Sequence, residues 1–195
     1  MGSYIGLKWR GGRLAFSYTI CFCRHADRIL MLFRHYQPHR FKWNGLGGKL
    51  EPGESPSAGV FREVMEESNL ELGSATSVRF AGLVTWSQSK GRASSTSGMY
   101  AFIADFEDPA VTWAGERATR EGRLSWKQLN WVCDPGNPLV VENIPFFLPP
   151  MLDIESPGSY HCTYSRDRLI DVYQQPLDEG DKGWPPGFLA SANQK

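Results

Sequence analysis

Three glutamates, Glu63, Glu66 and Glu67, stand at spacings of three and four residues. On a helix, these spacings place all three carboxylates within one narrow arc. Like charges at such spacings repel each other by about 0.2–0.5 kcal/mol per pair, and no lysine stands four residues after any of them. A helix that gathers three acids in this way needs a compensating positive charge.

Two further carboxylates stand before this helix, Glu54 directly ahead of it and Glu51 three residues earlier. Oxygen ligands in this number suit a hard cation, Mg²⁺ or alternatively Mn²⁺. Such an ion bridges phosphate oxygens and lowers the pKa of a bound water molecule. A solvated acidic face is the ordinary interpretation of acids on a helix. The convergence of five carboxylates at one loop–helix junction favours a cation site instead.

The residues just before this junction suit a phosphate ligand. Gly47 and Gly48 allow the backbone to approach a bound group closely, and Lys49 follows them directly. Gly-Gly-Lys alone is a weak signal and is often only a loop. Next to a helix rich in carboxylates, it predicts a site for metal–phosphate chemistry.

The helix that positions these acids has clear ends in the sequence. Ser55 is a good N-cap, Pro56 is tolerated at the first helical position, and Asn69 suits a left-handed residue after Ser68. Before it, Pro52-Gly53 predicts a type II turn. The apolar face that we expect to be buried lies opposite the carboxylates and comprises Val60, Phe61, Val64 and Met65.

The rest of the chain alternates short apolar runs with turn residues, which predicts a strand-rich domain. We expect a hairpin turn at 25–27, a short helix within 140–152, and a mobile loop at 89–98, which has no apolar anchor. From residue 176 onward, proline, glycine and polar residues predict a loose tail. The predicted strands cover residues 14–23, 28–35, 78–88, 99–106, 124–132, 160–164 and 168–173.

Length and charge restrict the function. A chain of 195 residues with 41% hydrophobic residues fits one domain with a real core. Lys plus Arg equals Asp plus Glu, so the formal net charge is zero. A nucleic-acid polymer usually needs a basic surface, and this balance predicts none. A small anionic substrate needs only a metal ion or local positive charge.

The four cysteines include no C-x-x-C pair, and their number is low for a disulfide scaffold. We therefore expect buried, reduced thiols in a cytoplasmic protein. The first thirteen residues contain no long apolar stretch of a signal peptide, and no run of eighteen apolar residues predicts a membrane span. Oligomeric state is not indicated by the sequence.

The junction resembles a known motif, the Nudix box. That box runs Gly, five residues, Glu, seven residues, Arg-Glu, an aliphatic residue, any residue, Glu-Glu, any residue, Gly and an aliphatic residue. One position departs, since Asn69 replaces the late Gly, and Asn also tolerates a left-handed backbone. A match over so many positions is specific. The matching residues are Gly48, Glu54, Arg62, Glu63, Val64, Glu66, Glu67 and Leu70.

The resemblance extends to the MutT-like branch, the 8-oxo-dGTP diphosphatases. Residues 41–49 are similar to the segment that precedes the box in that branch. Glu121 precedes Trp126 by five residues, as a metal-binding Glu does there. Residues 142–147, followed by a hairpin, are similar to the end of the human-type enzyme. The resemblance implies an α/β fold, a mixed β-sheet between helices, over residues 14–173, with an extension at 1–13 and a flexible tail at 174–195.

The resemblance also implies roles for individual residues. Metal ligands would be Glu63, Glu66, Glu67 and Glu121, together with Gly48. Glu54 would be a supporting acid tied to Arg62, which would orient a catalytic carboxylate. Gly47, Gly48 and Lys49 would bind the phosphates.

Base recognition is implied for three residues. Asn44 matches a residue that contacts the base edge in this branch. Glu142 and Asn143 align with two acids that recognise the oxidised purine. Asn rather than Asp at the second position departs from the pattern for 8-oxoguanine. A surface acid and a helix N-cap are equally good interpretations of these two residues.

The expected reaction is Mg²⁺-dependent attack of water on phosphorus, which converts a nucleoside triphosphate into the monophosphate and pyrophosphate. Glu63 and Glu121 are both candidates for the general base. Two alternatives stay open: a Nudix hydrolase of ADP-ribose or dinucleoside polyphosphates, and a nucleotide sensor that does not cleave its ligand. ADP-ribose hydrolases often have a Pro about fifteen residues after the box, and none occurs at residues 71–108. Dinucleoside polyphosphate hydrolases often have a Tyr nearby, and Ser87 occupies that region. Sensors usually lack ligand acids that this chain keeps.

Overall fold

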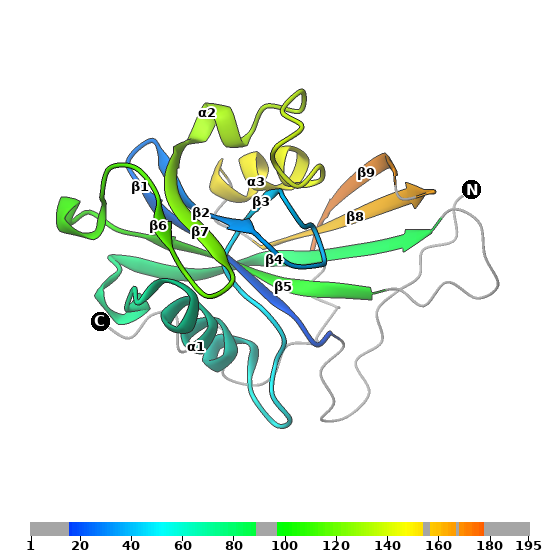
Figure 1. The fold of residues 1–195 in the computed structure, drawn as a ribbon. Coiled ribbons are helices and arrows are strands. Elements are labelled where there is room, and N and C mark those ends of the chain that lie inside the picture. The colour runs from blue at the N-terminus through cyan, green and yellow to red at the C-terminus, as the bar shows by residue number, and fades with distance from the viewer. Residues whose placement is uncertain (1–15, 89–96, 154–156, 167, 178–195) are drawn as a thin grey trace.

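The computed structural model describes residues 16–88, 97–153, 157–166 and 168–177. One mixed sheet carries α1 on one face and α2 and α3 on the other (Figure 1). This is the layered α/β arrangement expected from the sequence. The helices are α1 (Pro56–Ser68), α2 (Leu129–Val132) and α3 (Ile144–Asp153), with short 3₁₀ turns at Leu72–Ser74 and Pro109–Val111.

Nine strands form the sheet, in the order β6-β7-β2-β1-β5-β4-β8-β9, and β3 pairs with β2 outside this path. β1 runs parallel to β5, and β4 runs parallel to β8, while the other pairs are antiparallel. The strands are β1 (Thr19–His25), β2 (Arg28–Arg34), β3 (Trp43–Asn44), β4 (Ser77–Gln88), β5 (Ser97–Asp105), β6 (Arg117–Ala118), β7 (Gly122–Gln128), β8 (Gly158–Ser165) and β9 (Arg168–Pro176).

Alternation along β1 divides the core between the two faces. Cys21 and Cys23 point into the cluster that also contains Val60 and Val64 of α1. Ile20 and Phe22 point into the cluster formed with α2 and α3, as expected when successive side chains point to opposite faces. Both faces of the central strands are therefore buried. The expectation of buried, unpaired thiols holds for three cysteines, while Cys133 is half-buried.

The ends of α1 are those expected. The Ser55 hydroxyl accepts a hydrogen bond from the Ala58 N–H at 3.1 Å. Asn69 adopts φ 55° and ψ 25°, and its N–H donates to the carbonyl of Met65. These caps satisfy backbone groups that the helix leaves without partners at its ends. The turn before the helix is also confirmed, with φ 82° at Gly53.

The buried face of α1 differs from the prediction. Val60 and Val64 are fully buried, but Phe61 and Met65 are 42% and 38% exposed. Glu67 is only 7% exposed, because the helix is rotated so that part of its carboxylate arc faces the sheet. The spacing of apolar residues alone predicted the wrong centre for the buried face of α1. That spacing does not show that the Gly47 N–H hydrogen-bonds the Glu67 carboxylate on the buried side of the helix.

One other prediction needs correction. The strand expected at 124–132 ends at Gln128, and the next four residues form α2. The change follows from a backbone contact, since the Leu129 N–H donates to the Asp27 carbonyl at the β1–β2 turn. The short helix expected within 140–152 is confirmed as α3, which begins at Ile144 and ends at Asp153. The hairpins β1–β2 and β8–β9 are confirmed, and β9 includes the first residues of the expected tail.

Parts of three predictions lie outside the described residues. These are the extension at 1–13 with the start of the first strand, most of the loop at 89–98, and the tail beyond residue 177. Residues 97 and 98 of that loop belong to β5. Within the described part of the chain, no helix has the length and apolar character needed to cross a membrane.

Candidate functional site

The glycine loop is fixed to the beginning of β1. The Thr19 N–H donates to the Gly48 carbonyl at 2.9 Å, and the Cys21 N–H donates to the Leu46 carbonyl. Gly47 has φ 136°, and a Cβ there would lie 2.4 Å from the Thr19 carbonyl oxygen. Only glycine allows this close approach, so the loop position depends on residue type and not only on length.

Two carboxylates of α1 lie directly against this loop. Glu67 Oε2 accepts a hydrogen bond from the Gly47 N–H at 2.8 Å. A Cβ built at Gly48 would lie 2.5 Å from Glu63 Oε2, so the Glu63 carboxylate occupies the space that glycine leaves free. The loop and the helix therefore bring Gly47, Gly48, Glu63 and Glu67 together, as the sequence predicted.

Arg62 holds the remaining acids of the box. Its Nε and Nη2 both donate to the Glu54 carboxylate at 2.9 Å, a bidentate pair. Its Nη1 donates to Glu63 at 3.0 Å and to Glu66 at 3.3 Å, and Nη2 also donates to the carbonyl of Lys49. The hydrogen bond from Arg62 lowers the pKa of Glu54. Arg62 therefore links the turn, the loop and the helix.

Glu67 is the most perturbed of these carboxylates. Its pKa is raised to about 8, mainly by burial and also by the nearby charges of Glu121 and Glu63, whereas the Gly47 N–H and Arg34 lower it. Burial also raises the pKa of Glu63, against the lowering effect of Arg62. Carboxylates from α1 and from the segment before β7 thus interact electrostatically. Such perturbed, clustered groups are typical of functional sites.

Arg34 joins this site although it was not among the residues singled out in the sequence. Its Nη1 lies 3.5 Å from Glu121 Oε2, and its side chain is only 15% exposed. The Glu121 carbonyl accepts a hydrogen bond from the His35 N–H, which attaches this segment to the end of β2. The sequence did offer one signal for this role, because Arg34 is a basic residue at the end of a buried strand. A side chain at that position faces the same edge of the sheet as the neighbouring segments.

The donor set fits a hard divalent cation. Glu63, Glu66, Glu67 and Glu121 offer only carboxylate oxygens, and the charge that raises the pKa of Glu67 would be offset by a cation. As they are oriented, no three His, Cys, Asp or Glu side chains of the described residues converge on a single point. Glu63 and Glu66 accept from Arg62, and Glu67 accepts from Gly47, so binding requires these side chains to turn.

The residues expected to recognise a base also come together. The Trp43 N–H donates to the Leu139 carbonyl, and the Val141 N–H donates to the Trp43 carbonyl, so β3 lies beside the segment that leads into α3. Lys42 Nζ lies 3.7 Å from Glu142 Oε2. Asn44, on β3, is therefore close to the 142–143 segment.

Asn143 is buried, with an exposed fraction of 7%. Burial raises the pKa of the Tyr164 hydroxyl and of the Cys162 thiol, whereas the nearby Asn143 side chain lowers the pKa of both. Tyr164, on β8, was part of a predicted strand but was not assigned to the site. Lys49 is exposed and only its carbonyl contacts the box, through Arg62.

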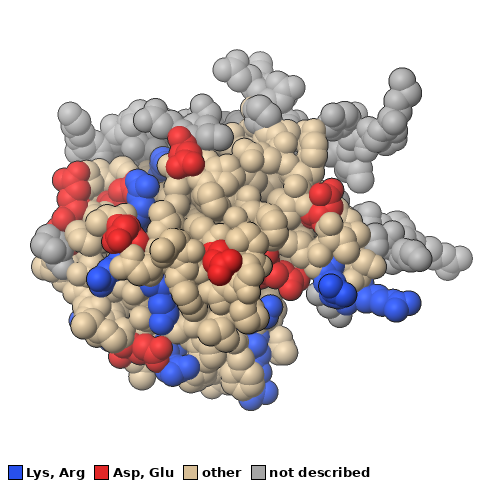
Figure 2. Space-filling view, turned by 90° about the horizontal axis from the view of Figure 1, so that it is seen from above, with Lys and Arg blue, Asp and Glu red and all other residues tan. Residues whose placement is uncertain are grey.

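Surface charge is mixed on the face that carries α2 and α3. Acidic and basic side chains are interspersed there and no single-sign area dominates the view (Figure 2). This agrees with the zero formal net charge of the chain. A broad basic surface, which would suit a nucleic-acid polymer, is not seen on this face.

Comparison with known proteins agrees with this geometry. A Nudix hydrolase of Bacillus subtilis (strain 168), YvcI, described as uncharacterized, is 30% identical over 113 residues, which are 57% of this chain and 65% of that protein. The chain thus matches less than two thirds of the length of that relative.

Two solved structures share the fold. A MutT protein from Bacillus halodurans has a TM-score of 0.62 at 23% identity, with coverage of 83% of this chain and 98% of the other. A bifunctional NMN adenylyltransferase/ADP ribose pyrophosphatase from Francisella tularensis has a TM-score of 0.53 at 19% identity, with coverage of 71% and 40%.

The NUDIX domain model matches residues 14–137, which include the glycine loop, α1 and Glu121. Strands β8 and β9 and helix α3 follow this match in the chain and complete the sheet and its cover. More than half of the chain is matched, and the box residues assemble at one junction. The protein is a member of the NUDIX domain family.

Proposed function

We propose that this protein is a pyrophosphohydrolase that uses Mg²⁺, or Mn²⁺, to cleave a nucleoside polyphosphate. The observation that carries the proposal is the buried carboxylate of Glu67, held against the Gly47 N–H within electrostatic reach of Glu63, Glu121 and Arg34. Such a cluster is unfavourable unless positive charge is bound, and phosphate chemistry uses a bound cation.

Each part of the junction has a role in this proposal. Glu63, Glu66, Glu67 and Glu121 would hold the metal, with the Gly48 backbone beside them. The bound ion supplies charge neutralisation for the diphosphate and a lowered pKa for water. Arg34 and Lys49 would contact phosphate oxygens, and Glu54 would keep Arg62 in place through their bidentate contact.

The reaction is the attack of water on phosphorus. The oxygen of water forms a bond to phosphorus, the bond from phosphorus to the bridging oxygen breaks, and the departing phosphate takes the electron pair. A carboxylate takes the proton of the water. Glu63 is the better placed of the two candidates, because it lies directly against the Gly48 backbone and is less exposed than Glu121.

The proposed substrate is a purine nucleoside triphosphate, including oxidised forms such as 8-oxo-dGTP. The carboxylate of Glu142 and the amides of Asn44 and Asn143 offer both donors and acceptors for the edge of a base. The products would be the nucleoside monophosphate and pyrophosphate.

Product analysis tests the proposal. The protein would be incubated with Mg²⁺ and a panel of 8-oxo-dGTP, dGTP, ATP, ADP-ribose and diadenosine tetraphosphate, with Glu67→Gln as the inactive control. We expect monophosphate and pyrophosphate from the triphosphates, and a loss of at least about 10³-fold in the variant. If ADP-ribose or diadenosine tetraphosphate were hydrolysed faster than the triphosphates, that compound would replace the purine nucleoside triphosphate as the proposed substrate.

Binding without products at saturating Mg²⁺ would indicate a sensor module instead of an enzyme. Undiminished activity of Glu67→Gln would contradict the site. Thermal unfolding of the variant serves as the folding control. Because Gln keeps an acceptor for the Gly47 N–H and removes a buried charge, we expect its Tm in the absence of metal to equal or exceed that of the parent.

A further inference from the structure

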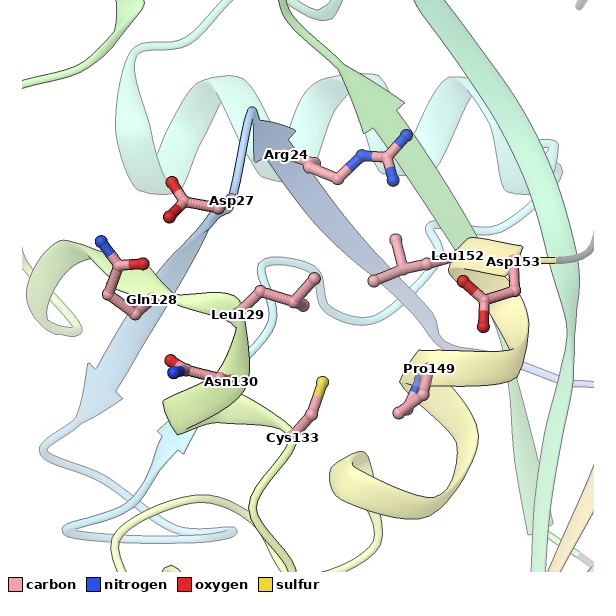
Figure 3. A pocket seen from close by; sticks show the side chains of 9 residues that line it. All are labelled: Arg24, Asp27, Gln128, Leu129, Asn130, Cys133, Pro149, Leu152 and Asp153. Atoms are coloured by element: carbon pink, nitrogen blue, oxygen red, sulfur yellow. The ribbon is translucent and has the colours of Figure 1, made fainter.

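A second cavity lies far from the loop–helix junction along β1. The junction contacts β1 at Thr19, whereas the cavity is formed at the other end of the strand, where Arg24 and the turn residue Asp27 lie. Helices α2 and α3 complete it, and its volume is about 440 Å³ (Figure 3). Small-molecule sites commonly have volumes in this range.

The cavity has an apolar middle and acidic sides. Figure 3 shows Asp27 on one side and Asp153, at the end of α3, on the other. Between them, Leu129 of α2 and Leu152 of α3 lie across the cavity from each other. The order of groups across the opening is therefore acid, apolar surface, acid.

The charge of the lining is negative. Among the described residues that line the cavity, Arg24 is the only cation, and its Nε lies 2.5 Å from Asp105 Oδ1, so its charge is already matched. Neither Asp27 nor Asp153 forms an ion pair with another residue in the described part of the chain. Two carboxylates therefore remain available to a ligand, and an anionic ligand is disfavoured.

We propose that this cavity binds a linear aliphatic diamine or polyamine. One ammonium group would meet Asp27, another would meet Asp153, and the methylene chain between them would cover Leu129 and Leu152. A monoamine can satisfy only one carboxylate, and a neutral ligand satisfies neither. The proposal concerns a site separate from the phosphate chemistry and does not depend on the substrate.

Cys133 provides a probe inside the cavity. It is half-buried and lines the cavity, whereas Cys21, Cys23 and Cys162 are buried. The protein would be alkylated with a small neutral maleimide near pH 8, and the modified residue would be identified by mass spectrometry. We expect alkylation at Cys133 that spermidine or putrescine slows several-fold, and that butylamine and butanediol slow little.

Isothermal titration with spermidine measures binding directly, in the absence of nucleotide. Exposed ion pairs are worth about 0.2–1 kcal/mol each, so Asp27→Asn or Asp153→Asn should weaken binding by about 2–5-fold, and the double variant should weaken it by about 10-fold or more. Asp171→Asn, on β9, is the matched control and should bind as the parent does. Unchanged Tm values would show that the variants fold.

Three outcomes would overturn the proposal. Spermidine binding of equal strength in the double variant would place the ligand elsewhere. Equal protection of Cys133 by butanediol would show that apolar contact alone is responsible. No heat and no protection up to about 10 mM spermidine would show that the cavity does not take this class of ligand. None of these results depends on hydrolase activity, so they are independent of the function proposed above.

Discussion

The loop–helix junction and the base-recognition region are assembled from different parts of the sequence. The junction is formed mainly by residues 47–67, joined by Arg34 and Glu121. The base-recognition region brings Asn44 next to Glu142 and Asn143, with Tyr164 behind them. In the proposed function, a motif of local residues carries out the phosphate chemistry, whereas base recognition depends on packing between distant segments. Substitutions in the first region should therefore affect turnover, and those in the second should affect substrate choice.

After Glu67→Gln, the largest effect is expected from Gly48→Ala. The added Cβ would lie 2.5 Å from the Glu63 carboxylate, which must then move. The carboxylate is the end of a flexible side chain, so the fold should be kept. We expect kcat to fall by about 10²-fold, as displacement of a catalytic group by about 1 Å can do. Steady-state kinetics and Tm measure the two effects, with Gly73→Ala as the control, because an added Cβ at Gly73 meets nothing within 4 Å.

If the kcat of Gly48→Ala were within about 3-fold of the parent value, the contrast between the two regions would not hold. The contact between the loop and Glu63 would then be structural only. A large loss of Tm with Gly48→Ala would also weaken the comparison, because reduced turnover would then report unfolding.

A smaller effect is expected from Arg34→Ala. Arg34 contacts Glu121 and opposes the negative charge around Glu67. Charge-assisted hydrogen bonds are worth about 1.5–3 kcal/mol, so we expect kcat/KM to fall by about 10–100-fold. Arg34→Lys should recover part of this loss, because it keeps the charge without the planar group. If Arg34→Ala matched the parent in kcat/KM at several Mg²⁺ concentrations, Arg34 would have no part in the site.

In the recognition region, Asn143→Asp should change preference more than rate. It places a carboxyl group where the oxidised-nucleotide enzymes have one. We expect the ratio of kcat/KM for 8-oxo-dGTP over dGTP to rise by about 3–10-fold, with kcat for the better substrate nearly unchanged. Equal loss on both nucleotides would mean that Asn143 only supports Tyr164 and Cys162. Tyr164→Phe, which removes the hydroxyl next to Asn143 and leaves Asn143 in place, separates these cases.

The smallest effect concerns a region outside both sites. The two ring nitrogens of His161 lie 2.8 Å from Thr85 Oγ1 and 2.9 Å from Ser87 Oγ, across β4 and β8. Burial lowers the pKa of His161 below 6.5, and Asp171 opposes this. The unfolded chain therefore binds the proton more readily. The contribution to stability is present above about pH 6.5 and is lost as pH falls through the lower folded pKa.

His161→Gln should remove this pH dependence. We expect the difference in Tm between pH 7.5 and pH 5 to shrink by roughly 1–2 °C relative to the parent, since the group is only partly buried. Thermal scans at a series of pH values measure the change. An identical pH profile for the parent and the variant would show that His161 does not titrate in this window.

The sequence predicts the local features of the molecule well. Ser55 and Asn69 mark the ends of α1 because caps act through neighbouring backbone groups, and Gly47 and Gly48 mark the loop for the same reason. Both faces of β1 are buried, so its nearly continuous apolar sequence was sufficient to identify it as a strand.

Features that depend on distant contacts were not predicted. The rotation of α1 that buries Glu67 and exposes Phe61 follows from the position of the Gly47 N–H, which the helix periodicity does not contain. The place of Arg34 depends on how β2 meets the segment of Glu121. The proximity of Asn143 to Tyr164 requires β8 to pass beside the start of α3.

The parallel pairing of β1 with β5 has a consequence for folding kinetics. Arg24 and Asp105, which meet across this pair, are 81 residues apart in the sequence, whereas β1 meets β2 across a tight turn. Closing so long a loop is slow compared with forming a hairpin or a helix. The core beneath α1 includes side chains of β5, so the helix lacks part of its support until that strand arrives. During refolding, turnover should return with the slow formation of this parallel pair, after the hairpin has formed.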